Sequence, residues 1–119
     1  MREISLEGSD ALVTASVADS FLTRGRGLLG RALPAPGHGL LLRRCSSVHT
    51  CFMPGPLDVV GLRRLDDAEM EVTWLSRDVP PWRLRFARNH TQDILELRAG
   101  EIARMGLAAG DRLRVVTPS

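Results

Sequence analysis

The sequence has no lysine and no tyrosine, and all 16 of its basic side chains are arginines. Arginine binds phosphates and carboxylates with a planar fork, so a nucleic-acid partner has to be considered. The arginines are scattered, however, and 14 acidic residues bring the net charge to +2. Because non-specific nucleic-acid affinity needs a clustered basic face, we expect no nucleic-acid partner and attribute the missing lysine to coding composition.

Long apolar runs are also absent. No stretch approaches the roughly 18 apolar residues of a membrane-spanning helix. The first ten residues contain Glu3 and Glu7, and no apolar segment follows Arg2, so they lack the form of a secretory signal. We therefore expect a cytoplasmic protein without a membrane partner.

Cysteine is scarce, with Cys45 and Cys51 the two present among 119 residues. In a reducing compartment we expect both to be free thiols. The chain is 44% hydrophobic and 25% charged, values typical of a soluble globular protein, and its length suffices for one core without cross-links. We predict a single domain over residues 1–119.

Short segments rich in alternating apolar residues, punctuated by glycine and proline, dominate the chain. Segments of this kind cover residues 11–17, 39–43, 47–53, 57–62, 69–77, 93–98 and 112–116, and helical patterns cover 20–31 and 99–106. The predicted fold class is mainly β (α+β): a single-domain antiparallel β-sandwich or open barrel of about seven strands with two short helices. We also expect a hairpin turn at Asp66-Asp67, and core packing by both tryptophans.

Residues 44–58 concentrate the chemically active side chains. They hold both cysteines, one of the three histidines and a Pro-Gly-Pro turn that precedes Asp58. Because side chains alternate along a strand, a strand over 47–53 would direct His49, Cys51 and Met53 to one face. This segment is therefore the predicted chemical site.

The histidine and cysteines of this segment are residue types that bind metals or take part in covalent catalysis. His49 and Cys51 supply two of the three or four ligands that zinc needs, and Cys45 or His90 would have to complete the set. Cys51 as nucleophile with His49 as base is an open alternative, but side chains two positions apart on a strand lie roughly 7 Å from each other. We expect no metal, no cofactor and a non-catalytic protein, although the enzyme question stays open.

A second set of residues is ionic. Arg24 and Arg31 lie on one predicted helix, Asp58 follows the proline turn, and Glu96 occurs in an otherwise apolar strand. Alternation places Glu96 beside Ile94 and away from Leu95 and Leu97, where a carboxylate must be solvated or paired with an arginine. Two interpretations remain: a structural arginine–carboxylate bridge, or a cleft that binds a polar ligand.

The order of several motifs resembles a known family. These motifs are residues 24–31 (RGRGLLGR), 49–53 (HTCFM), 56–58 (PLD), 95–100 (LELRAG), 106–107 (GL) and 110–111 (GD). Together they resemble the bacterial and archaeal family called domain of unknown function 192, over residues from about 11 to 116. The resemblance implies a compact, mostly β domain of the leaderless, cytosolic type, and it implies no reaction. Family members carry an aromatic, a basic residue and an asparagine around the Met-Pro turn, whereas this chain has Met53-Pro54-Gly55-Pro56.

Our functional prediction is a small, non-catalytic binding domain for a small polar ligand or a partner protein. The predicted ligand-binding residues are Arg24, Arg31, His49, Met53, Asp58 and Glu96. One alternative is a hydrolase or transferase that uses Cys51 and His49, and thiol reactivity would separate the two. The other is an accessory or structural component of a secretion or pilus assembly.

Overall fold

The structure is a computed structural model that describes residues 2–8, 12–18, 33–51 and 53–116. These ranges hold nine strands and one short helix. In chain order they are β1 (Arg2–Glu7), β2 (Leu12–Ala18), β3 (His38–Leu42), β4 (Ser47–His49), β5 (Leu57–Arg64), β6 (Glu69–Val79), β7 (Leu84–Phe86), β8 (Asp93–Arg98), α2 (Glu101–Met105) and β9 (Arg112–Val116).

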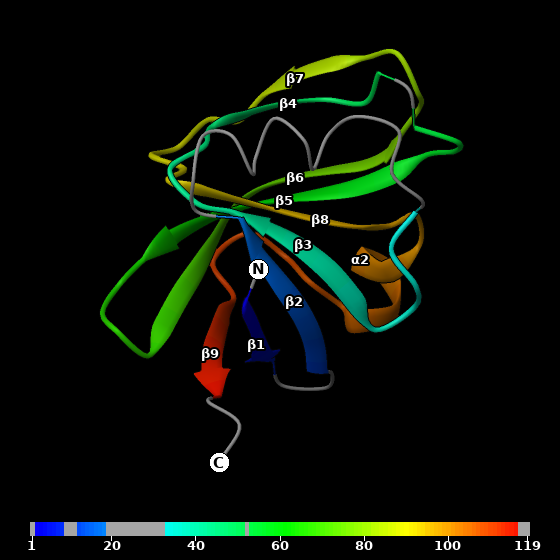
Figure 1. The fold of residues 1–119 in the computed structure, drawn as a ribbon. Helices are drawn as coiled ribbons and strands as arrows, with labels where there is room; N and C mark the ends of the chain where they lie inside the picture. Colours follow the sequence, from blue (N-terminus) through cyan, green and yellow to red (C-terminus); the bar gives the residue numbers. More distant parts are fainter. Residues whose placement is uncertain (1, 9–11, 19–32, 52, 117–119) are drawn as a thin grey trace.

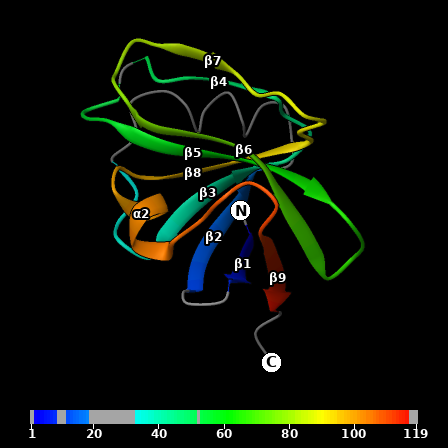
Figure 2. The same ribbon diagram turned by 180° about the vertical axis from the view of Figure 1, so that it is seen from behind.

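Seven of the strands form a closed barrel in the order β1-β2-β3-β8-β5-β6-β9, with β1 and β9 paired to close it. All neighbouring pairs are antiparallel except β2 and β3, which are parallel. Strands β4 and β7 form a separate two-stranded sheet, which Figures 1 and 2 show lying over β5, β6 and β8. The predicted mainly β fold of about seven strands is thus confirmed, as a closed barrel with a small extra sheet.

The alternation of β8 explains how the layers are built. Leu95 and Leu97 point into the barrel, where they join the main core cluster. Ile94 points outward into a second cluster, and its neighbour Glu96 is on the same side, as predicted from the sequence. Both faces of β8 are buried, so this strand separates two cores.

The main core fills the barrel. Its buried side chains come from every barrel strand and from α2, which contributes Ile102 and Met105. Figures 1 and 2 place α2 and the β5–β6 hairpin on opposite sides of the barrel. The second core lies between the barrel wall and the small sheet, and it joins Leu40 and Val59 of the wall to Val48 of β4. The small sheet is therefore attached through apolar contacts.

Several elements differ from the prediction. Strand β4 ends at His49, four residues earlier than expected, because the backbone turns there and the N–H of Met53 donates to the carbonyl of Thr50 at 3.2 Å. β1 and β7 were not predicted. Trp82 was expected on the core, but its left-handed backbone (φ 65°) accompanies a side chain that is 59% exposed. The predicted helix over 20–31 lies outside the described residues, whereas the one over 99–106 is confirmed as α2.

The turn between β5 and β6 forms as predicted at Asp66-Asp67. Asp66 accepts hydrogen bonds through Oδ1 from the N–H groups of Ala68 and Glu69, at 2.7 and 2.8 Å. An aspartate side chain that bonds to backbone N–H groups two and three positions ahead stabilises this kind of turn. The hairpin that results carries one wall of the pocket described below.

Helix α2 is held at both ends by local chemistry. Gly100 and Gly106 flank it with positive φ angles, 97° and 64°, which glycine adopts without steric cost. Glu101, in the first turn, pairs with Arg104 and accepts a hydrogen bond from the N–H of Gly37, which connects the helix to the segment before β3. The hydrogen bond from Arg104 lowers the pKa of Glu101 below its usual range.

We expect the Glu101→Gln variant to lose more stability at neutral than at acidic pH. A carboxylate whose pKa is lowered on folding stabilises the folded state at pH values above its unfolded pKa, and this contribution disappears as the pH falls through the folded pKa. Urea unfolding of both proteins between about pH 7 and pH 3 measures the effect, because the range brackets an ordinary glutamate pKa. A stability difference that stays constant over this range would contradict the assignment.

Candidate functional site

Asp58 is buried, with 1% of its surface exposed, and its carboxylate accepts three backbone hydrogen bonds. Oδ1 accepts from the N–H of Asp78 at 2.9 Å, and Oδ2 accepts from those of Gly100 at 3.0 Å and Ile102 at 2.9 Å. The first turn of α2 has no side-chain cap of its own, so Asp58 supplies the missing acceptor. Ligand binding by Asp58 stays a prediction, while these bonds give it a structural task.

Met53 and Glu96 are both buried on the second-core side of the barrel wall, 7% and 3% exposed. Met53 is a member of that core. Glu96 lies in β8 between Leu40 of β3 and Val59 of β5, two members of the same cluster. The structure therefore brings these two predicted site residues to one layer.

The shared strand face predicted for His49, Cys51 and Met53 does not form, because β4 ends at His49. Met53 instead joins Val48 in the second core. The sequence had predicted these two side chains on opposite faces of one strand. His49 Nδ1 is buried and has no hydrogen-bond partner in the described part of the chain. Cys51 is half-buried and free.

The other residues predicted to carry the chemistry are the two helix arginines and Cys45. Arg24 and Arg31 lie outside the described residues, so their place relative to Glu96 and Asp58 stays a prediction. Cys45 is a free thiol whose Sγ donates to the carbonyl of Ser47 at 2.8 Å. Across the described ranges, no three His, Cys, Asp or Glu side chains are grouped closely enough to hold a metal ion.

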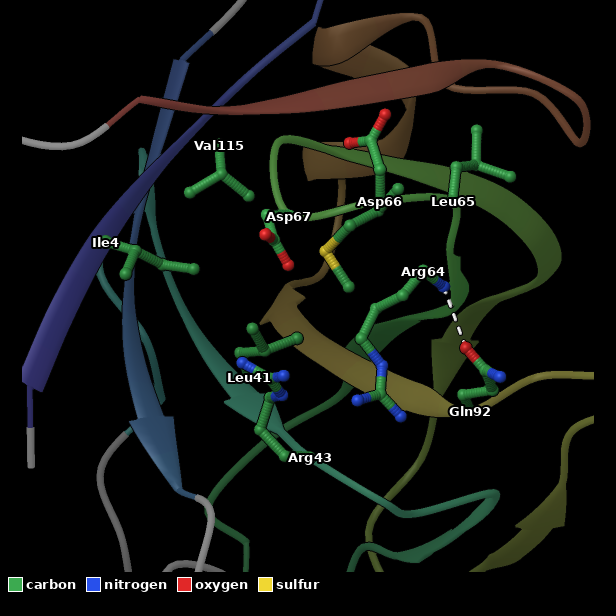
Figure 3. Close-up of a pocket in the computed structure, with 10 residues that line it drawn as sticks. Ile4, Leu41, Arg43, Arg64, Leu65, Asp66, Asp67, Gln92 and Val115 are labelled. Carbon is green, nitrogen blue, oxygen red and sulfur yellow. Dashed lines mark hydrogen bonds between the residues drawn. The ribbon is translucent and has the colours of Figure 1, made fainter.

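A pocket of about 680 Å³ lies at the β5–β6 hairpin side of the barrel (Figure 3). Its apolar lining comes from strands that are far apart in sequence, with Ile4 of β1, Leu41 of β3, Met70 of β6 and Val115 of β9. Its polar lining consists of Arg43, Arg64, Asp66, Asp67 and Gln92, with Leu65 completing the set. The size falls in the range of small-molecule sites, and the lining is divided equally between five apolar and five polar residues.

Two guanidinium groups converge on one buried carboxylate at this pocket. Asp93 is fully buried, and its oxygens lie 3.3 Å from Nε of Arg64 and 3.9 Å from Nε of Arg43. Asp93 also accepts a hydrogen bond from the N–H of Arg44 at 2.9 Å. Both of these distances are measured to Nε of the arginine.

Gln92 lies beside Arg43 and Arg64, and these three residues form the polar corner of the pocket. Oε1 of Gln92 accepts a hydrogen bond from the N–H of Arg64 at 2.9 Å, the dashed line in Figure 3. This bond fixes the amide so that its NH₂ group is available as a donor beside Arg64. Within the described chain, no hydrogen bond from the terminal amino groups of Arg64 is formed. The corner therefore offers several N–H donors next to an apolar surface.

Sequence reasoning missed Arg43, Arg64 and Gln92 as site residues. Each lies where a strand ends or begins: Arg43 directly follows β3, Arg64 is the last residue of β5, and Gln92 directly precedes β8. The available signal was an arginine pair at the end of two apolar strands, 43–44 and 63–64. That signal was too weak without the barrel order, which makes β3, β8 and β5 adjacent.

A family model described as DUF192, Uncharacterized ACR, matches residues 3–115. The chain belongs to the DUF192 family. This confirms the resemblance found in the sequence motifs, and the family description assigns no reaction. No match was found among the curated proteins.

Two solved structures resemble this DUF192 protein. A Sinorhizobium meliloti protein described as a "putative transcription regulator" has a TM-score of 0.78 at 24% identity, with 95% of this chain and 92% of that chain covered. A Novosphingobium aromaticivorans protein of unknown function has a TM-score of 0.75 at 20% identity, with 93% and 82% covered. At these identities the likeness establishes the fold. Separately, the described part of the DUF192 chain contains no helix long and apolar enough to cross a membrane.

Proposed function

We propose that this protein binds a small carboxylate-bearing molecule with an apolar body in the pocket at the β5–β6 hairpin. The observation that carries the proposal is the pairing of two arginines, Arg43 and Arg64, with one buried carboxylate above an apolar floor. Arginine forks match the geometry of carboxylates, so two guanidinium groups in the lining of such a pocket suit an anionic group.

The apolar floor defines the second half of the ligand. Side chains of Ile4, Leu41, Met70 and Val115 come from four strands and present aliphatic surface to the same cavity. Burial of apolar surface contributes roughly 25 cal/mol per Å², so an alkyl chain of a few carbons adds to the affinity that the ionic contact supplies. An aliphatic acid fits both halves.

Asp67 refines the ligand class further. It is exposed and lines the cavity, and Figure 3 shows it on a different side from the two arginines. Asp66 uses Oδ1 in the hairpin turn, so Asp67 is the carboxylate better placed to meet a cation. A zwitterion whose carboxylate meets the arginines and whose ammonium meets Asp67 would use both sides, which favours aliphatic amino acids.

Three probes of nearly equal shape test this proposal: 4-methylpentanoate, leucine and 3-methylbutylamine. Amide and methyl NMR titrations on labelled protein should show saturable shifts at pocket residues with the first two and none with the amine. For ligands of this size we expect dissociation constants on the order of millimolar. Pocket shifts with the amine equal to those with the acids, or no saturable shift with either acid, would refute the proposal.

Arg64→Met is the matched loss-of-binding variant, because methionine keeps an apolar stem but removes the donors. We expect carboxylate binding to weaken at least about tenfold, the typical value of one charged hydrogen bond. Arg63→Met is the control. Arg63 precedes Arg64 in β5, pairs with Glu71 at 2.9 Å and does not line the pocket. Equal effects of the two substitutions would contradict a specific role for Arg64.

A further inference from the structure

The small sheet carries an apolar ridge on its outer face. Trp82, Leu84 and Phe86 alternate along and just before β7, and their side chains are 59%, 55% and 66% exposed. Three of the four large hydrophobic side chains found exposed in the described chain belong to this ridge. The register explains the direction: Leu84 lies opposite His49 and Phe86 opposite Ser47, whereas Arg85 lies opposite the buried Val48.

The backbone of β7 has a free edge. β7 pairs with β4 and with no other described strand. The N–H of Thr50 donates to the carbonyl of Arg83 at 2.9 Å, and the N–H of Ala87 donates to the carbonyl of Ser46 at 2.7 Å. The backbone groups of the odd-numbered residues in and beside β7 therefore point toward β4. In an antiparallel pair the backbone groups of alternate residues point to opposite edges, which directs those of Leu84 and Phe86 away from β4. A row of such groups is a template for another strand.

Arginines lie along the same edge. Arg85 donates from Nη1 to the carbonyl of Leu84 at 3.0 Å, and Arg83 donates from Nη1 to the carbonyl of Trp82 at 3.3 Å. Arg88 follows two residues after β7. Residues 79–92 contain no acidic residue. Within the described chain, none of these three arginines forms an ion pair, so the edge is basic as well as apolar.

We propose that β7 is a docking edge for an extended, acidic peptide segment of a partner protein, which adds to the small sheet as a third strand. The N–H groups of Leu84 and Phe86 would supply hydrogen bonds to the peptide, and the ridge would receive alternate apolar side chains. The arginines select acidic residues at the positions between them. This inference concerns a surface that shares no residue with the pocket, and it does not depend on the ligand proposed there.

The charge pattern also decides between possible occupants. Two copies of this chain that paired antiparallel through β7 would place arginines opposite arginines, and like charges directly opposite each other destabilise a sheet. A membrane surface would attract the arginines and the ridge, but it would leave the open backbone edge without hydrogen-bond partners. An acidic strand satisfies the side chains and the backbone together.

The test uses a fluorescein-labelled peptide of alternating valine and glutamate, and its counterpart of alternating valine and lysine. Fluorescence anisotropy should show binding of the glutamate peptide, weakened by salt as expected for charged contacts near a surface. NMR spectra should place the shifts at the amides of Leu84 and Phe86. Equal affinity for the lysine peptide, or no binding of the glutamate peptide at millimolar concentration, would overturn the proposal.

Leu84→Pro tests the strand addition itself, with Leu84→Ala as its control. Proline removes an N–H that points away from β4, and proline is tolerated on edge strands in that orientation. We expect at least about a tenfold larger loss of peptide affinity for proline than for alanine, because proline also removes a backbone donor. A thermal melt checks folding, and Arg85→Gln gives a second measure that leaves the backbone intact. Equal affinities of the proline and alanine variants, or anionic vesicles bound in preference to the peptide, would refute the proposal.

Discussion

Replacing Asp58 with alanine is expected to lower the free energy of unfolding by about 3 kcal/mol or more. The substitution removes the acceptor of three backbone N–H groups, those of Asp78, Gly100 and Ile102. An unsatisfied buried donor costs about 1–3 kcal/mol, and the N–H of Ile102 is fully buried. Urea denaturation followed by circular dichroism measures the loss.

Asp58→Asn sharpens this experiment because it preserves the shape of the side chain. One carboxylate oxygen accepts a hydrogen bond from the N–H of Asp78, and the other accepts from the first turn of α2. An asparagine side chain has only one acceptor oxygen, so it can replace only one of these two. We therefore expect a loss between those of wild type and alanine. Asp111→Ala is the control, since Asp111 is exposed and its side chain accepts one hydrogen bond, from the N–H of Ala108. A loss for Asp58→Ala no larger than for Asp111→Ala would contradict the structural role.

The second large effect is expected at Asp93. Asp93→Ala should destabilise the protein by about 2–4 kcal/mol, because it removes a fully buried carboxylate that accepts from Arg44 and balances Arg43 and Arg64. The two arginines remain partly exposed, with 25% and 38% of their side chains accessible, so water offsets part of the cost. Chemical denaturation again gives the value.

Glu71→Ala is the matched control for Asp93. Glu71 also pairs with an arginine of β5, Arg63, but both side chains are partly exposed, at 29% and 42%. Exposed ion pairs contribute at most about 1 kcal/mol. If removal of Asp93 cost no more than removal of Glu71, the buried carboxylate would not be the anchor of the pocket arginines.

Much of the fold could be predicted because local patterns and burial agree. β8 and β9 were predicted with their observed bounds, and the glycine that ends α2 was identified from its position after the helical pattern. β4 was predicted too long, since alternation over 47–53 continues in the sequence although the backbone turns after His49. β7 has only three residues, with one arginine between its two apolar residues, so its pattern was too short to distinguish from a loop.

The site was harder to predict than the fold. Asp58 was singled out because it follows the proline turn and Glu96 because it occurs in an otherwise apolar strand, and both are buried. The pocket residues were missed because Arg43, Arg64 and Gln92 come together only through the barrel order, which places β8 between β3 and β5. Local patterns do not predict long-range strand pairing of this kind. The alternation within a strand indicates which side chains share a face, but it does not indicate which strands lie beside it.

The pairing of β1 with β9 has a consequence for biosynthesis. Ser5 lies opposite Val116, and Glu7 pairs with Arg114, which is 107 positions away. A ribosome-bound chain cannot complete this seam until β9 has been synthesised and released from the exit tunnel. Until then, β1 and β6 each have an unpaired edge, and an unpaired strand edge can form hydrogen bonds with another unfolded chain. The closed barrel is therefore completed only after β9 has emerged, and its main core stays open along this seam until then.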